Sequence, residues 1–163
     1  DLIRQAVQLA KKAGLKVSID LASYNVVEAN LDFLREIISG YVDIVFANED
    51  EALALTGLEA DNAVHEIAKL CDIAVVKVGK DGSHIKAHGV NHRVEGIAAN
   101  CIDTTGAGDL FASGFLYGMT QQHPFDVCGK IGSIVAGNVV EVVGAKMDEV
   151  RWNTMKTVID KVI

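Results

Sequence analysis

Apolar residues recur at helical spacing over residues 2–13, and Gly14 follows them as a residue suited to ending a helix. Residues 15–20 then alternate in a way that predicts a strand. A helix that leads directly into a strand is the second half of a β–α–β crossover, because parallel strands need a long connection. The sequence does not contain the strand that opens this crossover. We therefore expect the chain to be the C-terminal portion of a longer protein.

The hydrophobic pattern after this crossover alternates between helix and strand. Residues 42–47 and 73–78 are short apolar runs of the kind found in buried parallel strands. Residues 83–88 and 91–97 alternate between polar and apolar and predict an antiparallel hairpin with one wet face. Asp20 and Asn25, near the end of the first strand, fit either an ordinary loop or a cleft. Helices are predicted over 31–39, 49–56, 63–71, 107–121, 125–143 and 149–162.

These elements together predict an α/β fold. We expect a mainly parallel sheet with an antiparallel edge hairpin and helices on both faces. One predicted helix contains Gly129, Gly132 and Gly137, which indicates close approach to a neighbour, either another helix or a nucleotide. His84, His88 and His92 recur every four residues, but they fall in the hairpin without a carboxylate or thiol to complete a metal site.

Composition narrows the function classes. The chain has 163 residues, of which 50% are hydrophobic and 23% charged, as in an ordinary soluble domain. Its net charge of −7 argues against nucleic acid or an anionic membrane as the main partner, although backbone amides can still bind one phosphate group. Neither a signal peptide nor a membrane span is predicted. Three cysteines without C-x-x-C spacing predict buried thiols in a reducing, cytoplasmic setting: Cys71, Cys101 and Cys128.

Glycines cluster at the start of the predicted helix 107–121. Gly106 and Gly108 permit backbone angles and close approaches that a Cβ would block. Unpaired N–H groups at a helix start converge and carry about half a positive charge, so they form an anion site. Asp109 lies on the rim of this site, where its carboxylate could accept a proton from a hydroxyl beside a bound phosphate.

Three interpretations of this glycine cluster compete. The glycines could simply form a tight strand-to-helix turn, with Asp109 favouring the helix dipole. A dinucleotide fingerprint requires glycine where Phe111 stands and an acidic residue about 20 positions further on, and neither requirement is met. No segment supplies a Walker A loop. The third interpretation is phosphoryl transfer with Asp109 as the base.

Three motifs resemble those of one known family. Residues 103–109 read Asp-Thr-Thr-Gly-Ala-Gly-Asp and resemble the C-terminal signature of the ribokinase-like (PfkB) family of sugar and nucleoside kinases. Residues 48–51 resemble the N-x-x-E motif of this family, and residues 75–82 resemble its nucleotide loop. The motifs occur in the family's order, so the resemblance covers nearly the whole chain.

The resemblance implies an ATP-dependent phosphotransferase that acts on a hydroxymethyl group of a sugar or nucleoside. Asp109 would be the catalytic base, and Gly106, Ala107 and Gly108 would form the anion hole. Glu51 would act on Mg²⁺ through water, because Mg²⁺ keeps much of its hydration shell. Five residues would contact the nucleotide: Asn48, Lys77, Gly79, Lys80 and Gly82.

The resemblance also implies a monovalent-cation (K⁺) site at Asp103 and Thr105. The sequence departs from the family at Lys77, where Thr is frequent, and after Gly144, where no serine follows within a few residues. Members of the family are considerably longer than this chain. Residues 1–163 would then be the C-terminal nucleotide-binding and catalytic part, without the N-terminal half and its lid.

Several functional consequences follow from that partial coverage. The fragment alone is expected to be inactive, and a homodimer would form through the missing lid. The sequence does not name the acceptor. Two alternatives stay open: a nucleotide-binding module without turnover, and an NAD-dependent Rossmann domain.

Overall fold

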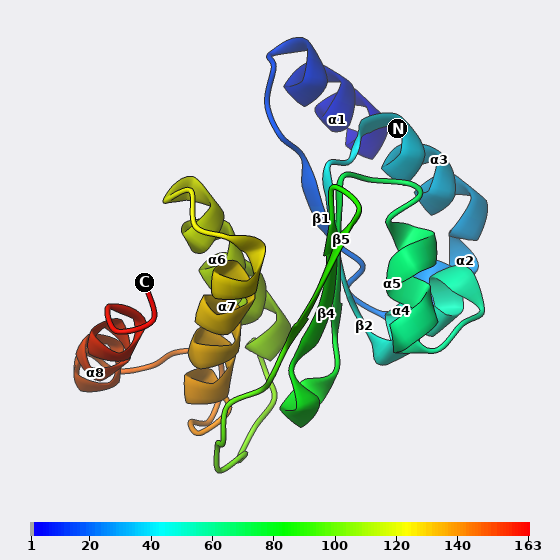
Figure 1. Cartoon of the computed structure of the whole chain (residues 1–163). Helices are drawn as coiled ribbons and strands as arrows, with labels where there is room; N and C mark the ends of the chain where they lie inside the picture. The colour runs from blue at the N-terminus through cyan, green and yellow to red at the C-terminus, as the bar shows by residue number, and fades with distance from the viewer. Residues whose placement is uncertain (1) are drawn as a thin grey trace. The chain divides into compact units, whose positions relative to one another are not determined.

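The computed structural model describes residues 2–163, which form two compact units (Figure 1). Of the described residues, the first unit comprises residues 2–77 and 84–91, and the second comprises residues 78–83 and 92–163. Asp1, the starting point of the expected domain, lies outside the described residues. Among the helices of residues 2–163, none combines the length and the apolar character that a membrane-spanning segment needs.

The first unit is built on parallel strands. β1 (Ser18–Asp20) pairs with β2 (Ile44–Asn48), which pairs with β3 (Ile73–Lys77), in both cases in parallel. β2 and β3 are buried along nearly their whole length, which explains their continuous apolar sequences. The helices of this unit are α1 (Leu2–Lys12), α2 (Tyr24–Ala29), α3 (Leu31–Tyr41), α4 (Glu49–Thr56) and α5 (Ala60–Ile67).

The sheet ends in a hairpin that the sequence pattern predicts. β4 (Ser83–Ala87) and β5 (Val90–Val94) complete the strand order β1-β2-β3-β4-β5. His88 and Gly89 connect them with φ angles of 49° and 84°, the double positive φ of a tight two-residue turn that joins antiparallel strands. The predicted α/β class, with a mostly parallel sheet and an antiparallel edge hairpin, is confirmed.

Several element boundaries differ from the predictions. The strand expected over 15–20 begins only at Ser18. The helix expected over 63–71 instead covers Ala60–Ile67. α2 was not expected, because its six residues show no apolar periodicity.

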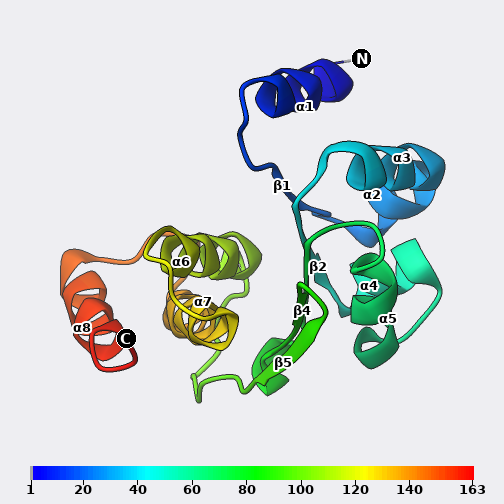
Figure 2. The ribbon, with the colours of Figure 1, turned by 45° about the horizontal axis from the view of Figure 1, so that its top comes forward.

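The second unit is mainly helical and includes the short 3₁₀ helix η1 (Gly79–Asp81). Its α-helices are α6 (Ala107–Thr120), α7 (Phe125–Val139) and α8 (Glu149–Ile159). α6 and α7 lie side by side in both views of the ribbon (Figures 1 and 2). A Cβ at Gly114 would lie 3.0 Å from the Cα of Gly132, so small residues allow this close packing. The helix–helix interpretation is confirmed for Gly132, whereas a Cβ on Gly137 would meet Ile97 in the preceding loop.

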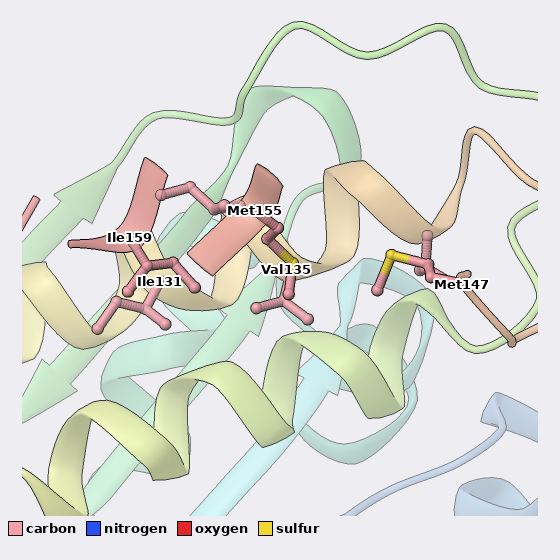
Figure 3. Close-up of a cluster of buried hydrophobic side chains, with 7 residues drawn as sticks. Ile131, Val135, Met147, Met155 and Ile159 are labelled. Carbon is pink, nitrogen blue, oxygen red and sulfur yellow. The ribbon is translucent and has the colours of Figure 1, made fainter. Parts of the chain in front are cut away.

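An apolar core fixes α8 and the loop before it against α7. Figure 3 shows this core, in which Met147, Met155 and Ile159 gather with Ile131 and Val135. The core explains the apolar positions of α8. The cysteines differ from expectation: Cys128 is buried, Cys71 is half-buried and Cys101 is exposed, so the prediction of three buried thiols is wrong.

Candidate active site

The last residues of the three parallel strands are polar. β1 ends at Asp20, β2 at Asn48 and β3 at Lys77. The register pairs Asn48 with Lys77 and Asp20 with Phe46, two residues before Asn48. Paired residues of a parallel sheet share a face, and so do residues two apart, so all three side chains emerge on one face. Ligands of open α/β sheets bind at these carboxyl ends.

Asn48 and Glu51 of the N-x-x-E motif form a capping box at the start of α4. The Asn48 side-chain oxygen accepts a hydrogen bond from the Glu51 amide at 2.8 Å. In return the Asn48 amide and side-chain NH₂ each donate to a different carboxylate oxygen of Glu51, both at 2.8 Å. The side chain of each residue thus accepts a hydrogen bond from the backbone amide of the other, and both amides would otherwise lack a partner at the start of the helix. The motif therefore has a structural role besides the one that the resemblance implies.

Glu51 is 3% exposed, although it carries a carboxylate. Burial raises the pKa of this carboxyl group above its ordinary value, while the Asn48 hydrogen bond and the Lys77 charge oppose the rise. Each carboxylate oxygen has two lone-pair sites, so each can accept one more hydrogen bond beyond the one from Asn48. Glu51 is thus able to bind a metal-coordinated water without giving up its cap.

Lys77 forms an ion pair across the end of the sheet. Its Nζ donates to Asp20 Oδ2 at 2.7 Å, and the two side chains are 14% and 27% exposed, respectively. β2 lies between β1 and β3, so the lysine side chain spans two strand spacings to reach this partner. The sequence left Asp20 open between loop and cleft, and the structure places it beside the predicted residue Lys77.

The N-terminus of α6 leaves backbone donors open. The Ala107 amide donates to the Thr104 carbonyl at 3.1 Å, so this amide is already used. Within residues 2–163, the amides of Gly106, Gly108 and Asp109 make no hydrogen bond. Free amides at a helix start, together with the helix dipole, favour an anion. Two of the three predicted anion-hole amides are therefore open to a ligand.

Gly106 is required by the geometry of this turn. Its φ of 79° is left-handed, and a Cβ there would lie 2.6 Å from the Cβ of Ala145. Asp109, in the first turn of α6, is exposed to solvent. Its carboxylate is thus accessible to an acceptor hydroxyl, as a base requires.

Asp103 fastens the loop before α6 to the loop after α7. Its Oδ1 accepts from the Thr105 amide at 2.9 Å and the Thr105 hydroxyl at 2.7 Å. Its Oδ2 accepts from the Gly144 amide at 2.8 Å. The Gly144 amide and the two Thr105 donors hold the pKa of Asp103 below its ordinary value. The sequence pattern does not predict this contact between Asp103 and Gly144.

The predicted nucleotide loop forms a separate glycine turn in the second unit. Gly79 and Gly82 have positive φ angles of 56° and 99°. The Val78 amide donates to the Gly82 carbonyl at 2.8 Å, and a Cβ on Gly82 would collide with the backbone of Val94. Lys80 is exposed on this turn. The glycines are thus explained by the turn itself, and their contact with a nucleotide stays a prediction.

The predicted site residues fall into three groups, one in the first unit and two in the second, of which the glycine turn at residues 79–82 is one. In the first unit, Asn48, Glu51 and Lys77 lie together with Asp20. In the second unit, the anion-hole residues and Asp109 lie beside the pair formed by Asp103 and Thr105. Within residues 2–163 there is no cluster of three or more metal-ligating side chains. A magnesium or monovalent-cation site at the named residues stays a prediction.

Comparisons with known proteins identify the class of molecule that this fold and these motifs define. The model of the pfkB family of carbohydrate kinases matches residues 1–151. The chain belongs to this family.

Individual relatives and solved structures agree with the family assignment. The ribokinase of Haemophilus influenzae is 29% identical over 153 residues, which is 88% of this chain and 47% of the relative. A probable sugar kinase from Rhizobium etli superposes with a TM-score of 0.90 at 34% identity, covering 99% of this chain and 49% of that one. An adenosine kinase from Sinorhizobium meliloti superposes with a TM-score of 0.89 at 33% identity, covering 97% of this chain and 49% of that one. The chain thus spans about half the length of these relatives.

Proposed function

We propose that the protein transfers the γ-phosphoryl group of ATP to a hydroxymethyl group of a sugar or nucleoside. One observation carries this proposal: the open amides of Gly106 and Gly108 lie at a helix start, with the exposed Asp109 carboxylate in the same turn. Phosphoryl transfer depends mainly on positioning and on stabilising charge, which such amides supply. Ribokinase and adenosine kinase among the similar proteins support these two acceptor classes.

Each predicted residue has a role in this proposal. Asp109 accepts the proton of the acceptor hydroxyl, and the amides of Gly106 and Gly108 hold the phosphoryl oxygens. Ala107 supports the turn through its bond to Thr104. Five residues bind the nucleotide: Asn48, Lys77, Gly79, Lys80 and Gly82.

Metal ions fit the proposal in different ways. Bound Mg²⁺ would neutralise charge on the phosphates. Glu51 would hold one of its waters, since both of its oxygens retain free lone pairs beside the Asn48 bonds. A K⁺ site at Asp103 and Thr105 would have to share a carboxylate that already accepts three hydrogen bonds.

The extent of the protein is also part of the proposal. We propose that residues 1–163 form the C-terminal nucleotide-binding and catalytic part of a longer kinase, because relatives are about twice as long. Acceptor binding and homodimer formation would depend on the remaining half and its lid. A cytoplasmic setting fits the three free cysteines.

Substitution of Asp109 in the full-length protein that carries this chain tests the proposal. Labelled phosphoryl transfer from ATP is measured with a panel of acceptors, including ribose, fructose, adenosine and cytidine. Asp109→Asn is expected to lower kcat about 10²–10⁴-fold, the usual contribution of a general base. Asp126→Asn, which changes an aspartate in the first turn of α7, is the matched control and should leave kcat unchanged.

Two results would contradict the proposal. A kcat of Asp109→Asn within about tenfold of the wild type would show that the base lies elsewhere. Nucleotide binding by the wild type without transfer to any acceptor would favour a binding module without turnover.

A further inference from the structure

The carboxylate of Asp20 is held in place from two sides. Its Oδ1 accepts a hydrogen bond from the Ala22 amide at 3.1 Å, and its Oδ2 accepts from Lys77 Nζ at 2.7 Å. Ala22 has a φ of 64°, a left-handed conformation that costs a residue with a Cβ about 1 kcal/mol or more. The Asp20–Ala22 bond closes this strained turn, as aspartate side chains commonly do. The carboxylate is therefore fixed before any ligand binds.

Lys77 has unused donors in a mostly buried position. Its ammonium group carries three N–H donors. Of the residues that the structure describes, only Asp20 accepts a hydrogen bond from it, and its side chain is 14% exposed. A largely desolvated ammonium group with free donors favours a further anionic partner.

The neighbouring side chains do not supply this second anion. The Glu51 carboxylate accepts hydrogen bonds from Asn48 but none from Lys77, which influences it only through space. The Lys77 side chain emerges on the same face of the sheet as Asn48, at the carboxyl ends of the strands, where parallel sheets bind ligands. An anion from outside the protein fits the open donors of Lys77.

We propose that Asp20 is a positioning residue for nucleotide binding, which holds the Lys77 ammonium group so that its free N–H donors meet phosphate oxygens of the nucleotide. This inference rests on the proposed function, since it takes Lys77 as a nucleotide contact. Asp20 itself does not touch the nucleotide. Its carboxylate partly neutralises the lysine in the free protein and restricts the flexible side chain to one position, which lowers the entropy cost of binding.

Binding of ADP to the full-length protein tests the role of Asp20. Calorimetry with ADP and Mg²⁺ is performed on the wild type, Asp20→Asn, Lys77→Met and the double variant. Each single substitution is expected to weaken binding about tenfold or more, as for one hydrogen bond to a charged group. The double variant should bind as weakly as Lys77→Met alone, because Asp20 acts through Lys77.

Control variants separate positioning from stability. Lys86→Met removes another half-buried lysine of the first unit, which contacts His65 at 3.0 Å, and should bind ADP like the wild type. Asp20→Glu keeps the carboxylate and should restore part of the lost affinity. Melting temperatures of all variants show whether folding changes, and activity with ATP should show a higher KM for ATP at similar kcat.

The outcomes that overturn the inference are distinct from failure of the proposed function. Wild-type affinity in Asp20→Asn contradicts it, and so does a double variant weakened by the product of the two single effects. A lower melting temperature in Asp20→Asn with unchanged affinity would assign the ion pair to stability alone. Absence of ADP binding by the wild type would instead refute the proposed kinase function.

Discussion

At the carboxyl ends of β1, β2 and β3 polar side chains are hydrogen-bonded to one another, whereas at the N-terminus of α6 backbone amides have no hydrogen-bond partner within residues 2–163. Asn48 and Glu51 exchange three hydrogen bonds, and Lys77 pairs with Asp20. The amides of Gly106 and Gly108 have no partner within residues 2–163. The first region is organised by its side chains, and the second by its backbone.

This difference determines how each region responds to substitution. A side-chain network can lose one charge and keep its hydrogen bonds if a neutral residue of the same shape replaces the charged one. A backbone site has no side chain to replace, so it changes only when the path of the chain changes. We therefore expect function to separate from stability in the first region and to be lost with backbone geometry in the second.

The largest effect on the reaction rate is expected at Gly106. Gly106→Ala places a Cβ 2.6 Å from that of Ala145 and should displace the open amides. A displacement of about 1 Å costs about 10²-fold in rate. Steady-state kinetics of the full-length protein measure kcat.

Two variants sharpen this test. Gly144→Ala introduces a side chain at a similar φ of 75° but into open space, so it controls for backbone strain. Ala145→Gly in the Gly106→Ala background removes the clash and should recover part of the rate. Equal losses in Gly106→Ala and Gly144→Ala would show that strain, rather than the position of the amides, limits the rate.

An intermediate effect on activity is expected at Glu51, where the role of the carboxylate charge can be separated from the role of the side chain in capping α4. Gln is accepted at this position of a capping box, and its one side-chain oxygen can keep the bond from the Asn48 amide, so Glu51→Gln should lower the melting temperature only slightly. Its loss of charge should raise the Mg²⁺ concentration for half-maximal rate about 10–100-fold, as for other groups that act on a metal indirectly.

Asn48→Ala is the complementary variant. It removes the cap and should destabilise the protein by about 1 kcal/mol. Thermal unfolding measures the loss of the cap in each variant, and Mg²⁺ titration of the activity measures the change in metal requirement. An unchanged Mg²⁺ requirement in Glu51→Gln would restrict Glu51 to the cap.

The smallest effect on function is expected at Asp43, before the amino end of β2. Burial raises the pKa of this carboxyl group, but the Val17 amide, Lys11 and Lys16 outweigh that effect and lower the pKa from 3.8 to about 2. A carboxyl pKa lowered by folding stabilises the protein above the unfolded value of 3.8, and this contribution is lost as the pH falls towards 2.

Thermal unfolding between neutral pH and pH 2 measures this contribution. Asp43→Asn should be less stable at neutral pH and lose less stability on acidification than the wild type. Asp32→Asn, an exposed change in the first turn of α3, should keep the wild-type pH dependence. Identical pH profiles for Asp43→Asn and the wild type would contradict the assignment.

Local patterns in the sequence predicted much of the fold and part of the candidate site. The predicted helix over 49–56 is confirmed as α4, and α6 begins at Ala107 as the glycine pattern predicted. The spacing of Asn48 and Glu51 also matches a capping box, a local signal that was interpreted only as a family motif.

Local sequence patterns do not predict contacts between residues that are far apart in the sequence. Asp20 and Lys77 are separated by 57 positions, and their ion pair follows from the strand register, which periodicity does not specify. The bond from Gly144 to Asp103 likewise joins residues 41 positions apart. α2 follows the left-handed Ala22, a conformation that the sequence gives no reason to expect at an alanine.

The central claim is that open amides at the start of α6 bind the phosphoryl group during transfer. Amide NMR of the full-length protein, with ADP, Mg²⁺ and aluminium fluoride as a mimic of that group, tests it directly. We predict downfield shifts of the Gly106, Gly108 and Asp109 amide protons, larger than that of Ala107, whose amide is bonded to Thr104. Unchanged resonances for these three amides, in a protein saturated with the mimic, would contradict the account.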